Sequence, residues 1–586
     1  MNLRRGKAAE QPRQRIGLMS EFGRFAPNRV FLAVVAGGLS GCLYALAIPL
    51  ILVAINAPDA GLSYGGAEVQ RFLGFEVGQP KLAAFFALFC LLILITRASA
   101  AIIIARVSME LSVSLRERLC RRIAQSPYPQ LEALGQARLT VAVTDDVRRI
   151  ISGAEVMPLM LINGMMLVGI FGFLYYINTN VFVFVLQAVA FGVVTFHIPM
   201  FIAGRYFRRA RQLYDTLERG VRGLILGVKE LQLDRHKRRG YFDQILQPCQ
   251  RDLLRAEKRA MTTLLAANSY GDLLFFFVIG AVAFVFVNYH AISGTDLVAV
   301  VMVLLYITGP IAVILNTLPN LSVATVSLRK IEEILGDLPD LAETERPLRK
   351  RPWRTISFAG ASYRHRADHA DDGFAVGPLD FSIRKGEITF IVGGNGSGKS
   401  TLCKMLSLHY PVATGRILFD EQVVDADCID DYRQDIATVF SDFHLFDRLL
   451  SPIDEEKLAA ANLYLRELAI DHKVQIKDGV FSTTDLSDGQ RKRLALVVSF
   501  VDDKELYLLD EWAADQDPAF KNVFYNEILL DLKAKGKAVV VVSHDDRYFH
   551  VADQLLIMED GKIIEKRLGE RVSYGTDTLA ALAMPA

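Results

Sequence analysis

Two adjacent carboxylates, Asp510 and Glu511, directly follow the apolar run LYLL, which has the composition of a buried strand. A buried carboxylate costs free energy unless it is paired or binds a metal ion. An isolated Asp-Glu pair more often marks only the exposed end of a strand. The role of this pair therefore depends on the other motifs in the chain.

A glycine-rich segment, EITFIVGGNGSGKST, lies upstream of the acidic pair and has the spacing G-x-x-x-x-G-K-[ST] after a β-rich apolar run. Glycines let successive backbone N–H groups point at a phosphate, a lysine reaches the terminal phosphates, and a serine hydroxyl coordinates magnesium. The segment therefore predicts a nucleotide-phosphate site. Its residues are Gly393, Asn395, Gly396, Ser397, Gly398, Lys399, Ser400 and Thr401.

Such a site needs a second strand that brings a carboxylate to the magnesium ion. The apolar run that ends at Asp510 supplies this carboxylate. Glu511, one residue further, points in another direction and can polarise the attacking water. We therefore expect Ser400 and Asp510 to hold Mg²⁺ and Glu511 to be the general base of nucleotide hydrolysis.

The segment LSDGQRKRLAL, Leu486 to Leu496, lies between these two motifs. In isolation it could be a helix N-terminus capped by Ser487. In its place before the acidic strand, it resembles the LSGGQ signature of ATP-binding cassette (ABC) proteins. In that family two cassettes dimerise head to tail. The resemblance therefore implies that Ser487, Gly489 and Gln490 bind the ATP held by the glycine loop of a second chain.

The resemblance extends to two further residues. It aligns Tyr363, in SYRHR, with the aromatic residue that stacks on adenine, and His544, in VVVVSHDD, with the histidine that contacts the terminal phosphate. A lone tyrosine or histidine is more often structural. The order of all the motifs along the chain favours the functional interpretation, which implies that ATP and Mg²⁺ are the cofactors.

The chain departs from the family pattern at the position of a glutamine that touches magnesium and relays substrate occupancy. Aligning VFSDFHLFD with V-x-Q-x-x-x-L-F places Ser441 there. Ser441 could hold the metal through a water molecule, or the neighbouring Asp442 could replace the glutamine.

A second departure follows Glu511, where the chain reads WAADQDP instead of a sequence that ends in SALD. Together with FSDFHLFD and SHDDRYF, this segment resembles the cyclic-peptide branch of bacterial ABC exporters. That branch includes exporters of siderophore precursors, lipopeptides and lasso peptides. The alternative is neutral drift in a general lipid or drug pump.

The first half of the chain contains long apolar stretches, whereas the second half alternates short strands, glycine turns and charged helices. A membrane span needs about 20 apolar residues. The Arg-rich stretches 106–156 and 204–270, together with the N-terminus, are predicted to be cytoplasmic by the positive-inside rule. Six segments qualify as spans: 29–55, 82–105, 157–177, 180–203, 271–289 and 296–316.

These features predict an α-helical membrane domain of six spans (the type I ABC exporter fold, by resemblance) followed by an α/β P-loop nucleotide-binding domain. We expect residues 1–27 to be a cytoplasmic tail with an interfacial helix, 28–335 the transmembrane domain with long cytoplasmic helical extensions, 336–354 a linker, and 355–586 the nucleotide-binding domain. One cassette per chain implies a homodimer. The resemblance places it in the bacterial inner membrane, in contact with lipid. The positive-inside rule and the even number of spans predict that both termini are cytoplasmic.

Polar residues within spans are often functional. Arg97 either snorkels or pairs helices, or it faces a cavity and binds an anionic cargo. His197 and Asn163 have the same two interpretations. Pro310 and Pro319, in TGPIAVILNTLPN, predict a kink or a flexible point in the last span.

The function predicted from these features is ATP-driven export of a peptide-derived product by alternating access. A general lipid or drug exporter and a siderophore importer with an exporter-type fold remain alternatives. The six spans argue against a soluble cassette protein that acts on nucleic acid, and the net charge of +1 gives such a partner no support. The intact Glu511 and His544 argue against a gate that uses ATP without hydrolysing it.

Overall fold

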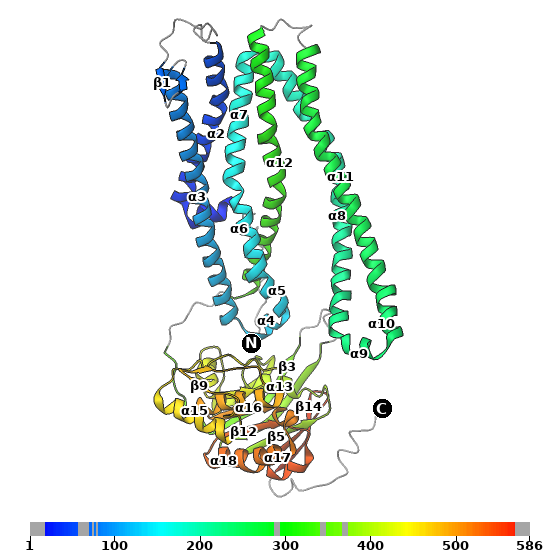
Figure 1. Ribbon diagram of the computed structural model, residues 1–586. Helices are drawn as coiled ribbons and strands as arrows, with labels where there is room; N and C mark the ends of the chain where they lie inside the picture. Colours follow the sequence, from blue (N-terminus) through cyan, green and yellow to red (C-terminus); the bar gives the residue numbers. More distant parts are fainter. Residues whose placement is uncertain are drawn as a thin grey trace. The chain divides into compact units, whose positions relative to one another are not determined.

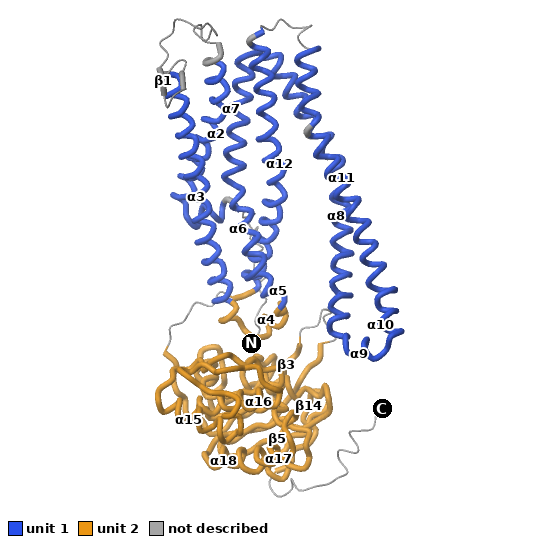
Figure 2. The backbone as a smooth tube through the Cα atoms, in the orientation of Figure 1, with its two compact units in different colours: residues 1–122, 137–337 blue, residues 123–136, 338–586 orange. Residues whose placement is uncertain are grey.

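The computed structural model describes residues 18–56, 70–72, 75–77, 80–285, 294–339, 347–365 and 373–568. The chain divides into two compact units (Figure 2). The first comprises Met1–Arg122 and Ala137–Asp337, and the second Ile123–Gln136 and Leu338–Ala586. The second unit thus takes in a short segment, 123–136, that the sequence assigned to the membrane domain.

Among the residues that the structure describes, the first unit contains six helices that are long and apolar enough to cross a membrane, as the sequence predicted. Large apolar side chains lie exposed on them, including Leu88, Leu94 and Phe191, as expected of a surface that faces lipid. Several of the helices continue well beyond the predicted spans, so the Arg-rich stretches are helical extensions (Figure 1). The helices are α2 (Pro27–Asn56), α3 (Pro80–Gln125), α7 (Met157–Ile177), α8 (Thr179–Leu226), α11 (Gln247–Gly280) and α12 (Gly294–Asp337).

Shorter elements connect these helices. The predicted interfacial helix is α1 (Leu18–Phe25), which buries Phe22 and leaves Arg24 exposed. The others are the hairpin β1 (Gln70–Phe72) and β2 (Phe75–Val77), the helices α5 (Gln136–Val141), α6 (Val147–Glu155), α9 (Val228–Leu233) and α10 (Arg235–Tyr241), and the π-helical turns η1 (Ala142–Asp146), η2 (Phe242–Leu246) and η3 (Ala281–Val285).

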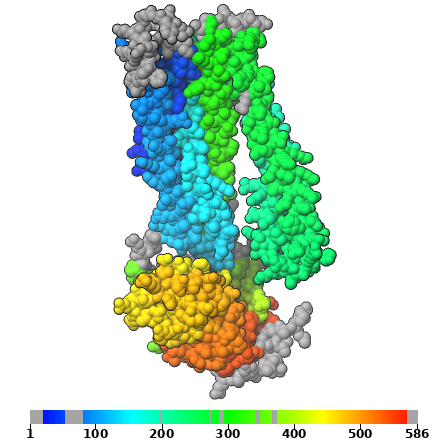
Figure 3. All heavy atoms as spheres, in the orientation of Figure 1, coloured from blue at the N-terminus to red at the C-terminus, as the bar shows by residue number. Residues whose placement is uncertain are grey.

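Close packing joins α2 to α7, where a Cβ added to Gly169 would meet the Cβ of Ala45. Small residues at such contacts let membrane helices approach each other. The helices α8 and α11 run side by side and diverge from α7 and α12 toward α9 and α10 (Figures 1 and 3).

Two of the polar span residues pair within the helical bundle. Arg97 on α3 donates a hydrogen bond of 2.9 Å to the hydroxyl of Tyr44 on α2, which is the helix-pairing interpretation. Asn163 donates to the carbonyl of Leu159 in its own helix at 2.6 Å. The side chain of His197 lies outside the described residues.

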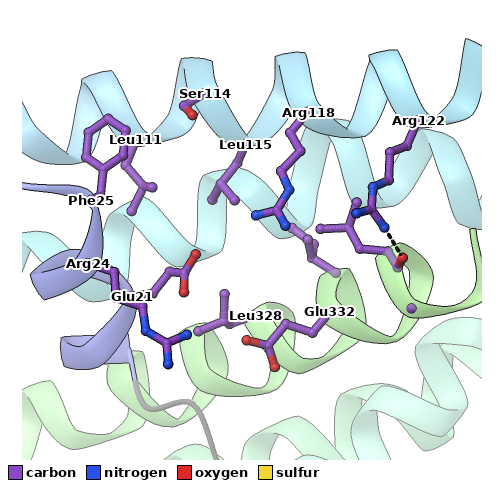
Figure 4. Close-up of a pocket in the computed structure, with 13 residues that line it drawn as sticks. Glu21, Arg24, Phe25, Leu111, Ser114, Leu115, Arg118, Arg122, Leu328 and Glu332 are labelled. Atoms are coloured by element: carbon purple, nitrogen blue, oxygen red, sulfur yellow. Dashed lines mark hydrogen bonds between the residues drawn. The ribbon is translucent and has the colours of Figure 1, made fainter. Parts of the chain in front are cut away.

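A cavity of about 520 Å³ lies between α1, α3 and α12 (Figure 4). Its lining includes side chains of both charges, among them Glu21, Arg118 and Glu332. Arg122 donates a hydrogen bond to the carbonyl of Leu335 across this cavity wall and so links α3 to the end of α12.

The second unit is built around a six-stranded sheet with the order β14-β13-β5-β12-β11-β8, in which only β14 is antiparallel to its neighbour. The described part of this unit also contains an antiparallel sheet, β4-β3-β6-β7, and a small β9-β10 hairpin. The strands are β3 (Thr355–Arg364), β4 (Ala375–Arg384), β5 (Ile388–Gly393), β6 (Thr414–Phe419), β7 (Gln422–Val423), β8 (Ile436–Val439), β9 (Ile476–Lys477), β10 (Val480–Phe481), β11 (Leu506–Asp510), β12 (Ala538–Val542), β13 (Gln554–Glu559) and β14 (Lys562–Leu568).

Both faces of the six-stranded sheet are covered, so β11 and β12 are buried along their whole length. Tyr507 and Leu509 pack with α15, α16 and the helices that follow β11, whereas Leu506 and Leu508 pack with α13 and the antiparallel sheet. The helices are α4 (Tyr128–Leu134), α13 (Lys399–Leu406), α14 (Ile429–Arg433), α15 (Glu455–Glu467), α16 (Asp488–Val501), α17 (Pro518–Val523) and α18 (Leu529–Ala534), with the shorter turns η5 (Trp512–Asp515), η6 (Phe524–Ile528) and η7 (Asp546–Val551).

The end of the predicted linker belongs to the second unit. Arg351 pairs with Asp431 at 2.8 Å. Trp353 is only 3% exposed, and its indole N–H donates to Asp435 at 3.1 Å. These contacts anchor the chain before β3 begins.

Candidate nucleotide-binding and hydrolysis site

The predicted site residues lie at the carboxyl ends of four neighbouring parallel strands. The glycine loop follows β5, His544 follows β12, Asp510 and Glu511 end β11, and Ser441 follows β8. Loops at the carboxyl ends of parallel strands meet at one edge of a sheet, where α/β proteins bind ligands. The fold therefore gathers at one edge residues that are far apart in the sequence.

The glycine loop wraps around its lysine. Gly398 has φ = +99°, a conformation that L side chains rarely adopt, and it lies at the start of α13. The ammonium group of Lys399 donates to the carbonyls of Gly393 (3.0 Å) and Gly394 (2.8 Å). Burial lowers the pKa of Lys399, although Glu511 and Asp510 oppose this shift. The lysine is thus held by neutral carbonyls that an anionic phosphate can replace.

Asp510 has the environment of a metal ligand. It is 1% exposed, and its Oδ1 has no hydrogen-bond partner among the described residues. Its Oδ2 accepts a hydrogen bond of 3.3 Å from Ser441. Burial and the charge of Glu511 raise the pKa of Asp510, while hydrogen bonds from Ser441 and Ser400 oppose the rise. A buried carboxylate flanked by two hydroxyls fits Mg²⁺, which prefers oxygen ligands.

Glu511 lines a cavity of about 360 Å³ that His544 also lines. The backbone of Glu511 is left-handed (φ = +50°), which turns its side chain out of the strand direction. Its Oε1 lies 3.3 Å from Nε2 of His544, and both side chains are about half exposed. The arrangement suits a base that must reach a water molecule.

The signature segment forms the start of α16. The hydroxyl of Ser487 accepts from the backbone N–H of Gln490 at 3.4 Å, and the side chain of Gln490 accepts from the N–H of Ser487 at 3.2 Å, which is a capping box. Gly489 is required sterically, because a Cβ there would lie 2.7 Å from the carbonyl of Asp515. Within the described chain, no hydrogen bond joins Ser487 or Gly489 to the glycine loop.

The sequence analysis missed two basic residues of α16 that hold the segment after Glu511. Lys492 donates to the Glu511 carbonyl at 2.8 Å and pairs with Asp515 at 2.7 Å. Trp512 is completely buried, and its indole N–H donates to the Lys492 carbonyl at 2.8 Å. The unusual tryptophan thus fixes the position of the predicted base relative to the signature helix.

The second basic residue, Arg493, holds the end of the same segment. It donates to Gln516 and to Asp517, each at 2.8 Å. Gln516 in turn donates to the Gly489 carbonyl at 3.0 Å. The departures in WAADQD therefore form one network with the signature helix. The basic pair in GQRKR was the only sequence signal for it.

Tyr363, which the sequence predicts to stack on adenine, has one face of its ring covered. Its side chain is 9% exposed, and its ring stacks on Tyr410 with 4.2 Å between centroids. His365, two residues later, is only partly buried, and its Nε2 lies 3.1 Å from the hydroxyl of Thr401 in the glycine loop. The two rings of SYRHR, Tyr363 and His365, lie against each other with 5.1 Å between centroids, and the stacking of Tyr363 on adenine stays a prediction.

Comparison with known proteins identifies the family. The family described as ABC transporter matches residues 376–514. The chain is 32% identical over 509 residues to the ATP-binding protein SyrD of Pseudomonas syringae pv. syringae. This alignment covers 85% of this chain and 90% of SyrD. It is 23% identical over 479 residues to an ATP-dependent lipid A-core flippase of Methylobacillus flagellatus, covering 77% and 78% of the two chains. The chain therefore belongs to the ABC transporter family and is an ATP-hydrolysing membrane transporter.

Proposed function

We propose that two copies of this chain export a peptide-derived product across the bacterial inner membrane by alternating access. The hydrogen-bond network between the segment WAADQD and the signature helix α16 carries this proposal. WAADQD is one of the segments that resemble the cyclic-peptide branch, and the network joins its residues into one structural unit with α16. Over alignments of similar length, the identity with SyrD (32% over 509 residues) also exceeds that with a lipid A-core flippase (23% over 479 residues), a relative named for the rival cargo.

In the proposed reaction, Lys399 exchanges the carbonyls of Gly393 and Gly394 for the phosphates of ATP. Ser400, Asp510 and Ser441 are the residues that would hold Mg²⁺, and the ion would neutralise charge on the phosphates. Glu511 accepts the proton of the attacking water, and His544 stabilises the terminal phosphate. Ser441 retains a hydroxyl contact with Asp510 where the family has a glutamine.

A second copy completes each site. The N-terminus of α16, with Ser487, Gly489 and Gln490, has no hydrogen bond to the glycine loop of its own chain within the described part. A helix N-terminus favours negative charge. We assign this end of α16 to the phosphates bound by the partner, which makes hydrolysis dependent on dimerisation.

The test is ATP hydrolysis by the purified chain in lipid nanodiscs, with and without cyclic, lasso and acylated peptides. The proposal predicts stimulation by at least one peptide class. Stimulation by lipid A or by lipophilic drugs alone would support the general exporter instead. The import alternative predicts ATP-driven uptake of a siderophore into right-side-out vesicles, which export does not produce.

A further inference from the structure

One carboxylate of α4 contacts two parts of the nucleotide-binding domain that border the predicted nucleotide site. Glu132 accepts a hydrogen bond of 2.6 Å from the hydroxyl of Tyr410 and lies 3.4 Å from the ammonium group of Lys404. Lys404 belongs to α13, the helix that begins with the phosphate-loop lysine, Lys399. Tyr410 stacks on Tyr363, the predicted adenine platform. Glu132 is therefore bonded next to both the phosphate end and the base end of the site.

Tyr410 is the common neighbour of the two rings in SYRHR. Its ring stacks on Tyr363 with 4.2 Å between centroids and an angle of 13° between the ring planes. It also meets the ring of His365 edge to face, with 5.5 Å between centroids. Aromatic pairs at such separations attract each other beyond the apolar area that they bury. A base that stacks on either ring therefore extends this cluster and restrains the ring of Tyr410.

The bond between Tyr410 and Glu132 depends on where the Tyr410 ring lies. Tyr410 is only 1% exposed, and a buried hydroxyl that loses its partner costs free energy. The ammonium group of Lys404 lies beside the same hydroxyl and 4.9 Å from the ring centroid of Tyr128, which is also on α4. The tyrosine hydroxyl and the lysine thus hold α4 on the domain together, and only the hydroxyl belongs to the cluster of rings.

The segment held by these contacts leads directly to a membrane helix. α3 is one helix from Pro80 to Gln125, and it continues beyond the predicted span 82–105. Only Ser126 and Pro127 separate it from α4. Residues 123–136 nevertheless belong to the unit that binds the nucleotide (Figure 2). A change in the position of α4 is therefore passed to α3 through a connection of two residues.

We propose that Tyr410 and Glu132 couple occupation of the base site to α4, so that the transporter responds to a whole nucleotide rather than to a bound triphosphate alone. Ser441 stands where the family has its relay glutamine, and this contact gives a second route from the site toward the spans. Both residues are positioning residues, because they act through the rings of SYRHR. The inference goes beyond the proposed function and holds for any cargo.

The first measurement compares ATP with ribose 5-triphosphate, which lacks only the base. Full-length protein carrying Glu511→Gln is kept in nanodiscs with Mg²⁺ and a saturating concentration of either ligand. Hydrogen exchange of the segment Ile123–Gln136 is followed by mass spectrometry. We expect ATP to slow this exchange about fivefold, as for weak coupling between sites, and ribose triphosphate to slow it less than about twofold. Equal slowing by the two ligands would overturn the inference.

The second measurement tests the two residues through ligand affinity. Coupling between sites is reciprocal, so the contact with α4 must also tighten binding of the base. Tyr410→Phe and Glu132→Ala should each weaken ATP binding about fivefold and change the affinity for ribose triphosphate by less than about twofold. The double variant should bind ATP no more weakly than either single variant, because all three lack the same hydrogen bond. Glu132→Gln keeps an acceptor and should recover part of the lost affinity.

Two variants serve as matched controls and should bind both ligands like the wild type. Tyr432→Phe matches the tyrosine, because Tyr432 is 3% exposed in the same apolar cluster but stacks on Phe419. Glu505→Ala matches the glutamate, because Glu505 also pairs with lysines, Lys385 and Lys537. It lies where β11 and β12 begin, at the opposite edge of the sheet from the nucleotide site.

The variants can contradict the inference in two ways. If Tyr410→Phe and Glu132→Ala bind ATP as tightly as the wild type, the contact carries no coupling. If they lose affinity for ATP and ribose triphosphate alike, the contact only stabilises the domain. Neither measurement uses a cargo, so failure of this inference and failure of the proposed peptide export are distinguishable.

Discussion

Replacing Glu511 by glutamine should separate hydrolysis from ATP binding. In the wild type, Nε2 of His544 lies 3.3 Å from the Glu511 carboxylate. Glutamine keeps the shape of the side chain and a hydrogen-bond acceptor near His544, but it cannot accept a proton. Loss of a general base lowers turnover by about 10²–10⁴-fold. Since Glu511 raises the pKa of Asp510, its neutralisation lets Asp510 ionise at lower pH. Binding of Mg-ATP should therefore be retained and should persist to more acidic pH than in the wild type.

The assay is phosphate release in nanodiscs, together with equilibrium binding of a fluorescent ATP analogue between pH 5 and pH 8. Glu527→Gln is the matched control, because Glu527 is exposed, lies in η6 and does not line the cavity that Glu511 lines. Wild-type turnover in Glu511→Gln would refute the assignment of the base. Loss of ATP binding would show that Glu511 acts in binding rather than in the chemical step.

Other variants test the remaining parts of the site. Asp510→Asn should abolish Mg²⁺-dependent hydrolysis yet raise the melting temperature of the nucleotide-free protein at pH 8, because the raised pKa of Asp510 means that folding destabilises its charged form. This gain in melting temperature should shrink as the pH falls toward that pKa, and a lowered melting temperature at pH 8 would contradict the argument. Trp512→Ala should destabilise the nucleotide-binding domain by about 3–5 kcal/mol, as measured by urea unfolding monitored by circular dichroism, and an unchanged midpoint would contradict its burial. If Tyr363 stacks on adenine, Tyr363→Ala should raise the KM for ATP more than His365→Ala does. A larger effect of His365→Ala would assign the adenine contact to His365.

Contiguous motifs made much of the site predictable. The glycine loop, Ser441, Asp510 and His544 each lie at the end of an apolar run with strand composition, and parallel pairing then places the ends of these runs together. The six spans were predictable for a similar reason, since length and hydropathy are local properties.

Features that depend on distant partners were not predictable from one sequence. Tyr363 is buried because Tyr410 stacks on it, and no local sequence pattern indicates that these two residues are in contact. Residues 123–136 join the second unit because Glu132 accepts a hydrogen bond of 2.6 Å from Tyr410 and Tyr128 lies against the same ring. Likewise, the contact of Lys492 with the Glu511 carbonyl arises from the way α16 packs beside the end of β11.

The most direct test of the central claim is transport of a labelled cyclic peptide into inside-out membrane vesicles that contain the wild-type protein or Glu511→Gln. ATP-driven export predicts accumulation of the peptide inside these vesicles with the wild type and none with the variant. Uptake only by right-side-out vesicles, or accumulation that is equal with the variant, would contradict the proposed function.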